Sequence, residues 1–201
     1  MLVFLLALVA CDPTVAGRVC LIGDSLSLGV LTPLHFELSA GYFVDGLFLP
    51  RERSELLIPV ASTPGARLDV SVSTGWVAGR LATSGVRCDQ AVISFGTNDI
   101  VDPGAAQAAE LDALMDALLG LPELEGVPVL WMAPSPTSAR HPQERVWAWR
   151  IALWRAEQRW PLLEVQDTPT RWLGPDGVHY TPDGYAQLAH ALAERLLVMV
   201  P

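Results

Sequence analysis

Three short motifs in this chain contain residue types that together could cleave an acyl bond. They are Gly23-Asp-Ser-Leu26, Gly96-Thr-Asn-Asp99 and Asp176-Gly-Val-His179. The hydroxyl of Ser25 is a weak nucleophile at neutral pH and needs an adjacent base, which His179 can supply. Asp176 can fix the tautomer of that histidine, and the amide of Asn98 can stabilise an oxyanion. The predicted chemistry is therefore acyl transfer through Ser25, with His179 as general base and Asp176 as its orienting carboxylate.

Each of these residues also has a structural interpretation. Ser25 could cap a helix, Asn98 could belong to an ordinary turn after a strand, and Asp24 is expected to hold a turn by accepting backbone hydrogen bonds. Asp176 and His179 could be two metal ligands, but the sequence offers no third ligand beside them, and no metal site is expected. The occurrence of all three motifs in one chain favours the catalytic interpretation.

The chain alternates strand-like and helix-like segments, which predicts a parallel sheet covered by helices on both faces. Strands are expected over 18–22, 68–73, 90–95, 127–133 and 162–166, with helices after Ser25 and over 105–119, 143–160 and 182–198. Residues 56–61 and 66–73 could pair as a hairpin around the turn at 62–65. Thr181 and Pro182 are typical of a helix start, so His179 is expected in the loop before the last helix.

The three motifs, in this order, resemble those of the SGNH (GDSL-type) hydrolase family, from about Arg18 to the C-terminus. This resemblance implies a three-layer α/β/α, flavodoxin-like fold with a parallel sheet of about five strands. It also implies an oxyanion hole built from the N–H of Ser25, the amide of Asn98 and a glycine N–H after the second strand. Gly75 is preferred as that glycine because it follows the predicted strand over 68–73, where Ser73-Thr-Gly75-Trp76 resembles the family's second block. Gly65 is the alternative, and it is less favoured because it fits a turn between paired strands better.

The reaction that this resemblance implies is hydrolysis of a carboxylic ester, of esterase, deacetylase or lipase type, through an acyl-serine intermediate. Two alternative functions are also compatible with this sequence. The first is acyl transfer to a sugar hydroxyl by the same triad, and the second is a non-catalytic envelope lipoprotein that binds carbohydrate or acts as a scaffold. The expected partners are small-molecule, glycan or lipid esters.

The N-terminus resembles the lipobox of bacterial lipoproteins. Residues 1–10 are almost wholly apolar and end in small residues before Cys11, the residue that would be acylated. The expected organisation is therefore a signal segment over 1–10 and a single hydrolase domain over 11–201. The expected location is outside the cytoplasm, with the protein tethered to a membrane of a bacterial envelope through Cys11.

Composition excludes several other classes of function. The formal net charge is −9, which disfavours a nucleic-acid partner, and the chain contains no lysine, which excludes Schiff-base chemistry and the phosphate-binding loop. No cofactor is expected. Cys20 lies in a predicted strand, where it can pack as a small hydrophobic residue, and Cys88 precedes another strand. The spacing does not decide whether these two cysteines form a disulfide bond.

Overall fold

The computed structural model describes residues 18–39, 42–44, 47–49, 57–102, 108–136, 141–168 and 171–199. The predicted signal segment and Cys11 lie outside these residues. Among the helices that are described, none has the length and hydropathy needed to cross a bilayer.

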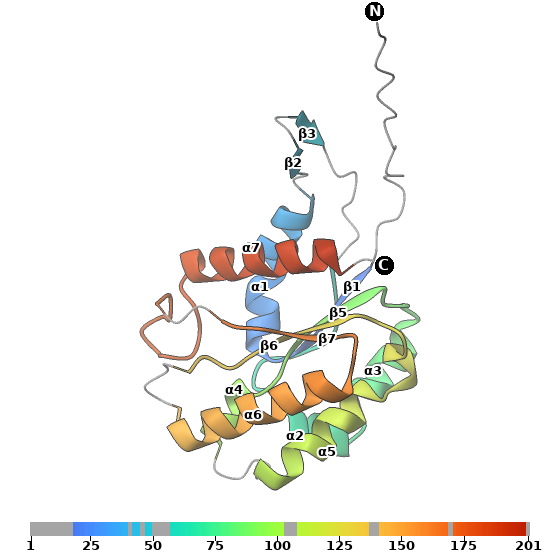
Figure 1. Ribbon diagram of the computed structural model, residues 1–201, viewed down its shortest axis with the longest axis vertical. Helices are drawn as coiled ribbons and strands as arrows, with labels where there is room; N and C mark the ends of the chain where they lie inside the picture. The colour runs from blue at the N-terminus through green and yellow to red at the C-terminus, as the bar shows by residue number, and fades with distance from the viewer. Residues whose placement is uncertain are drawn as a thin grey trace, which may run out of the picture.

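A five-stranded parallel sheet forms the centre of the fold (Figure 1). In the order of the sheet, its strands are β4 (Leu57–Ser62), β1 (Val19–Gly23), β5 (Gln90–Ser94), β6 (Val129–Met132) and β7 (Leu163–Gln166). A separate antiparallel pair is formed by β2 (Tyr42–Val44) and β3 (Leu47–Leu49). Because β1 is flanked by β4 and β5, the segments that follow these three strands meet at one edge of the sheet.

Helices cover both faces of the sheet, so the predicted three-layer α/β/α fold is confirmed (Figure 1). One face carries α1 (Ser25–Ser39) and α7 (Pro182–Val198). The other carries α2 (Leu68–Ser73), α3 (Trp76–Ser84), α4 (Thr97–Val101), α5 (Ala108–Leu119) and α6 (Gln143–Arg159). The side chains of β1 alternate between the two layers: Leu21 packs with α1 and α7, and Ile22 packs in the opposite core.

The last helix begins where the sequence predicts. Thr181 is the N-cap of α7, and its side chain accepts a hydrogen bond from the Gly184 N–H at 3.2 Å. Pro182 occupies the first turn, where its missing N–H costs no intrahelical bond. This start fixes the end of the loop that carries His179.

The predicted strand over Leu68–Ser73 is wrong, because these residues form α2. The hairpin around residues 62–65 is wrong for the same reason: β4 pairs in parallel with β1 instead. Both carboxylate oxygens of the buried Asp99 accept the N–H of Leu68, at 2.9 and 3.1 Å. This long-range contact satisfies an N–H at the start of the helix. A negative charge at that position also interacts favourably with the helix dipole.

A disulfide bond joins Cys20 of β1 to Cys88, which lies just before β5. Both cysteines are buried, and their Cα atoms are 5.6 Å apart. Cys20 is therefore a covalent cross-link inside the core as well as a small packing residue. The bond connects the central strand β1 to the entry of the neighbouring strand.

Helix α6 buries one aromatic stripe and exposes another. Trp149 and Leu153 are buried against the sheet, and the ring of Trp149 lies 6.4 Å from that of Trp131 in β6. On the outer side, Trp147 and Trp154 remain 56% and 61% exposed. Trp147 therefore takes no part in the core.

Candidate active site

The turn between β1 and α1 fixes Ser25 at the carboxyl edge of the sheet. Asp24 is fully buried, and its Oδ1 accepts the Leu26 N–H at 2.9 Å and the Ser94 hydroxyl at 3.1 Å. The Asp24 N–H donates to the carbonyl oxygen of Ser94 at 3.2 Å. These bonds connect the turn to the end of β5, so Asp24 has the structural role predicted for it. Burial raises the pKa of the Asp24 carboxyl to about 7.

Ser25, His179 and Asp176 form a continuous hydrogen-bonded line. The Oγ of Ser25 lies 2.8 Å from His179 Nε2, and His179 Nδ1 lies 2.6 Å from Asp176 Oδ2. With the Nδ1 proton directed to the carboxylate, Nε2 is free to accept the serine proton. The structure therefore brings together the three residues that the sequence analysis placed in this role, although they come from segments 154 residues apart.

The Asp176 carboxylate is held by the backbone of its own turn. Its Oδ1 accepts the N–H groups of Val178 and His179, each at 3.0 Å. The hydrogen bond from His179 and that from the Val178 N–H lower the pKa of Asp176 to about 2. The carboxylate is thus ionised throughout the neutral range, as a group that orients a histidine and stabilises its cation must be.

Asn98 connects the end of β5 to the loop after β4. It lies in the first turn of α4, and its Nδ2 donates to the carbonyl oxygen of Ala66 at 3.1 Å. The same nitrogen lies at a longer distance, 3.4 Å, from Asp24 Oδ2. The amide is therefore positioned between the turn that carries Ser25 and the loop that carries Gly65.

The structure removes the reason for preferring Gly75 over Gly65 as an oxyanion donor. Gly75 lies at the junction of α2 and α3, and its N–H donates to the carbonyl oxygen of Val72 at 3.0 Å. Gly65 instead follows β4, the strand beside β1, with a φ of +74°. In the described part of the chain, no hydrogen bond uses the Gly65 N–H. The strand that placed Gly75 near the site is a helix, so its predicted position is wrong.

An ionic network beside the site was not predicted from the sequence. Arg67 contacts Asp69 through Nε at 3.0 Å and through Nη2 at 3.1 Å, and its Nη1 contacts Asp102. Burial raises the pKa of Asp99, whose carboxylate binds the start of α2, to about 6. Asp99 lies within a motif already identified, so its burial could have been anticipated. The pairing of Arg67 with Asp102 spans 35 residues and leaves no signal in the sequence.

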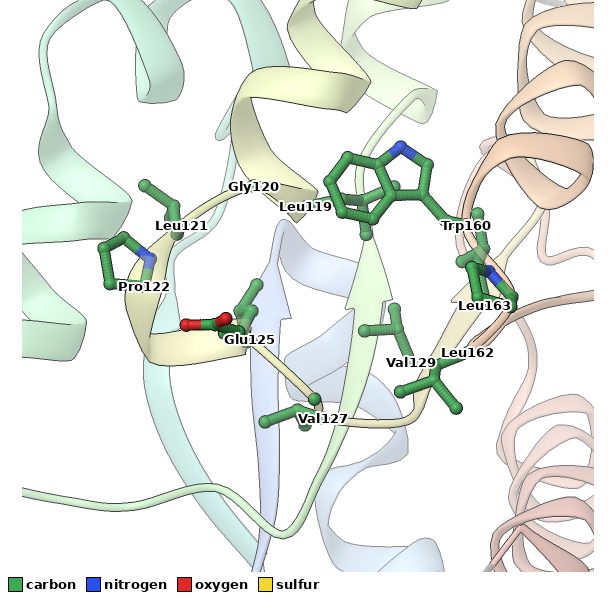
Figure 2. Close-up of a pocket in the computed structure, with 13 residues that line it drawn as sticks. Leu119, Gly120, Leu121, Pro122, Glu125, Val127, Val129, Trp160, Leu162 and Leu163 are labelled. Carbon is green, nitrogen blue, oxygen red and sulfur yellow. The ribbon is translucent and has the colours of Figure 1, made fainter.

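An apolar cavity lies away from Ser25 and His179, at the opposite edge of the sheet. Its volume is about 530 Å³, and it lies between the end of α5, the starts of β6 and β7, and Trp160 (Figure 2). Glu125 is the only charged side chain that lines it. Within the described residues, no group of three His, Cys, Asp or Glu side chains could hold a metal ion. The residues that line this cavity include no serine, cysteine or histidine, so the cavity offers no counterpart to the Ser25–His179 pair at the carboxyl edge.

The chain belongs to the GDSL-like Lipase/Acylhydrolase family, whose sequence model matches residues 21–187. This membership makes it a carboxylic ester hydrolase by class. No curated protein matches the chain significantly.

Solved structures of the same fold include several esterases. A lipase/acylhydrolase from Enterococcus faecalis is 17% identical, with 92% of this chain and 97% of that chain covered and a TM-score of 0.60. An acetylxylan esterase from Geobacillus stearothermophilus is 17% identical, with 90% and 94% covered and a TM-score of 0.63. A carbohydrate esterase family 3 protein from Talaromyces cellulolyticus is 18% identical, with 92% and 98% covered and a TM-score of 0.64.

Proposed function

We propose that this protein hydrolyses carboxylic esters through an acyl-enzyme intermediate on Ser25. The observation that carries the proposal is the alignment of Ser25 Oγ, the His179 ring and the Asp176 carboxylate, at 2.8 and 2.6 Å. Ser25 Oγ attacks the carbonyl carbon while its proton passes to His179 Nε2. The C–O bond to the alcohol then breaks, and His179 returns the proton to the departing oxygen. Water next gives a proton to His179 and attacks the acyl carbon, which releases the acid and restores Ser25.

The negative charge on the carbonyl oxygen is stabilised by three donors in this proposal. The N–H of Ser25 is at the first position of α1, where a helix has no internal acceptor for it. Gly65 supplies the second donor, because its N–H is unused in the described part of the chain. The long contact between Asn98 and Asp24, at 3.4 Å, leaves one N–H of the amide able to turn toward the substrate as the third.

Exposure of the triad favours hydrolysis over transfer to a sugar hydroxyl. The side chains of His179 and Asp176 are 45% and 41% exposed, so water can reach the acyl-enzyme. An acyltransferase must protect that intermediate from water. The intact triad disfavours a role limited to binding or scaffolding, because such a role needs no aligned serine, histidine and aspartate.

Turnover of phenyl acetate, with and without a sugar acceptor, tests this proposal. Ser25→Ala is expected to lower kcat by on the order of 10⁶, and His179→Ala similarly. Ser73→Ala provides a matched control, because Ser73 is an exposed serine on α2. A fluorophosphonate should label Ser25 in the unmodified protein and leave Ser25→Ala unlabelled. Activity above a few per cent in Ser25→Ala would exclude the serine mechanism, and an acylated sugar as the main product would favour transfer.

We also propose that the protein is exported and tethered to a membrane through an acylated Cys11. The lipobox-like sequence before Cys11 supports this, and so does the buried Cys20–Cys88 bond, because disulfides persist mainly in oxidising compartments. In a bacterial host able to make lipoproteins, the protein should partition into detergent, and Cys11→Ser should release it. Recovery of the full-length chain with an unmodified Met1 would contradict the proposal.

A further inference from the structure

A hollow lies beside Gly65, and none of its side chains takes part in the proton transfers proposed above. Its volume is about 470 Å³, and it is bordered by the loop after β4, by α2, by the start of α3 and by the end of α4. Gly65, Arg67, Thr74, Trp76 and Asp102 are among its lining residues. These segments lie on the face of the sheet opposite α1 and α7 (Figure 1).

The hollow is continuous with the proposed oxyanion site. Gly65 and Ala66 both line it, and the Ala66 carbonyl oxygen accepts the Asn98 amide at 3.1 Å. A substrate whose carbonyl oxygen meets Gly65 and Asn98 can therefore direct one of its two substituents, the acyl part or the alcohol part, toward this space. The side chains of the hollow decide which part fits.

The polar side chains of the hollow suit a ligand with many hydroxyl groups and no net charge. Arg67 is neutralised by Asp69 and Asp102, so it presents N–H donors beside carboxylate acceptors rather than a free positive charge. The Thr74 hydroxyl borders the hollow; its proton is donated to the Val70 carbonyl oxygen at 2.7 Å, so its oxygen is the part that serves a ligand, as an acceptor. A fatty acyl chain placed here would remove water from the ion pair and could not replace the hydrogen bonds that the ion pair makes to that water.

Trp76 supplies the apolar surface that such a ligand also needs. It begins α3, is partly buried against the core and borders the hollow. A sugar ring has C–H groups on its faces and hydroxyls around its edge, so it matches an aromatic ring surrounded by paired donors and acceptors.

From this combination we infer that the hollow is a subsite for a neutral sugar ring, which forms the alcohol part of the ester. The inference rests on the proposed function and extends it to a substrate class: acyl esters of neutral carbohydrates. Trp76 then acts in specificity, by binding the leaving group, and takes no part in the proton transfers.

The test compares two substrates, an acetylated methyl xyloside and phenyl acetate, which has no sugar. Trp76→Ala should lower the ratio of kcat/KM for the sugar ester to that for phenyl acetate at least tenfold, mainly through a higher KM for the sugar ester. Trp147→Ala removes an exposed tryptophan on α6, outside the hollow, and should leave the ratio unchanged. Trp76→Ala and the unmodified protein are also assayed on phenyl esters of longer carboxylic acids, to test whether the hollow binds the acyl part.

The outcomes distinguish a failure of the proposed sugar subsite from a failure of the proposed esterase activity. An unchanged ratio in a folded, active Trp76→Ala variant would overturn the subsite while leaving the esterase proposal standing. A changed preference for acyl length, with an unchanged ratio, would assign the hollow to the acyl part and would also overturn it. If the unmodified protein cleaves neither substrate, the proposed function itself fails. Should Trp76→Ala not fold, Trp76→Phe, which keeps an aromatic ring, and Thr74→Val carry the same comparison.

Discussion

Gly65 and Gly75 offer a matched pair of substitutions that tests the oxyanion hole. Their φ angles are +74° and +67°, and a Cβ added to either would meet no atom within 4 Å. Alanine should therefore cost both positions the same conformational strain, roughly 1–2 kcal/mol. Only at Gly65 does the added methyl lie beside an N–H proposed to bind the substrate. The backbone N–H remains in Gly65→Ala, but the methyl should crowd the substrate or turn the N–H away from it. Displacing one such donor costs about 2.7–4 kcal/mol of transition-state stabilisation, so Gly65→Ala should lower kcat/KM by on the order of 10²–10³.

The assay is hydrolysis of phenyl acetate by both variants, with thermal unfolding measured in parallel. Both proteins should melt a few degrees below the unmodified chain and within a degree or two of each other, because the strain is shared. Gly75→Ala should keep most of its activity, since its N–H is already bonded to Val72. The reasoning is refuted if Gly65→Ala remains fully active, or if Gly75→Ala loses as much activity as Gly65→Ala.

Three further outcomes follow from the site. Asn98→Ala should remove about 3 kcal/mol of transition-state stabilisation, which lowers kcat/KM with little change in KM. A purely structural role for Asn98 would instead appear as a lower melting temperature. Asp176→Asn should lower kcat by up to about 10⁴, because the amide no longer fixes the His179 tautomer; an unchanged pH–rate profile with full activity would contradict this. The pKa of Asp24 is raised to about 7 from 3.8, so the folded protein holds a proton that the unfolded chain has released between these values. The Asp24 contribution should therefore lower the free energy of unfolding as pH rises from about 4 to 7, and Asp24→Asn should flatten this slope in urea titrations.

The sequence predicted those parts of the fold that depend on local hydrophobic pattern. The buried runs of β1 and β5 and the capped start of α7 are local features, and each appears within a residue or two of its expected place. The hydrogen-bonded arrangement of Ser25, His179 and Asp176 was predictable too, because Asp176 and His179 share one turn and Ser25 follows a buried strand. Here the chemistry of the residues and the local structure indicate the same arrangement.

The segment Leu68–Ser73 was mispredicted because its alternation of apolar and polar residues is typical of a strand. The same spacing also places Leu68 and Ser71, three residues apart, on one buried side of a helix. The carboxylate of Asp99, distant in the sequence, binds the Leu68 N–H and favours that helix. The position of Gly75 depended on this segment, so one long-range contact changed both the element and the expected oxyanion donor.

The Cys20–Cys88 bond has a consequence for how the protein responds to proteolysis. The loop that it closes, between cysteines 68 positions apart, contains Ser25, Gly65 and Trp76, whereas Asn98, Asp176 and His179 lie beyond it. A single cut of the chain anywhere between the two cysteines therefore leaves both fragments joined by the cross-link. Such a nicked protein should run as one species on a non-reducing gel and as two after reduction. With the sheet intact, the cross-link keeps the fragment that carries Ser25 beside the one that carries Asp176 and His179.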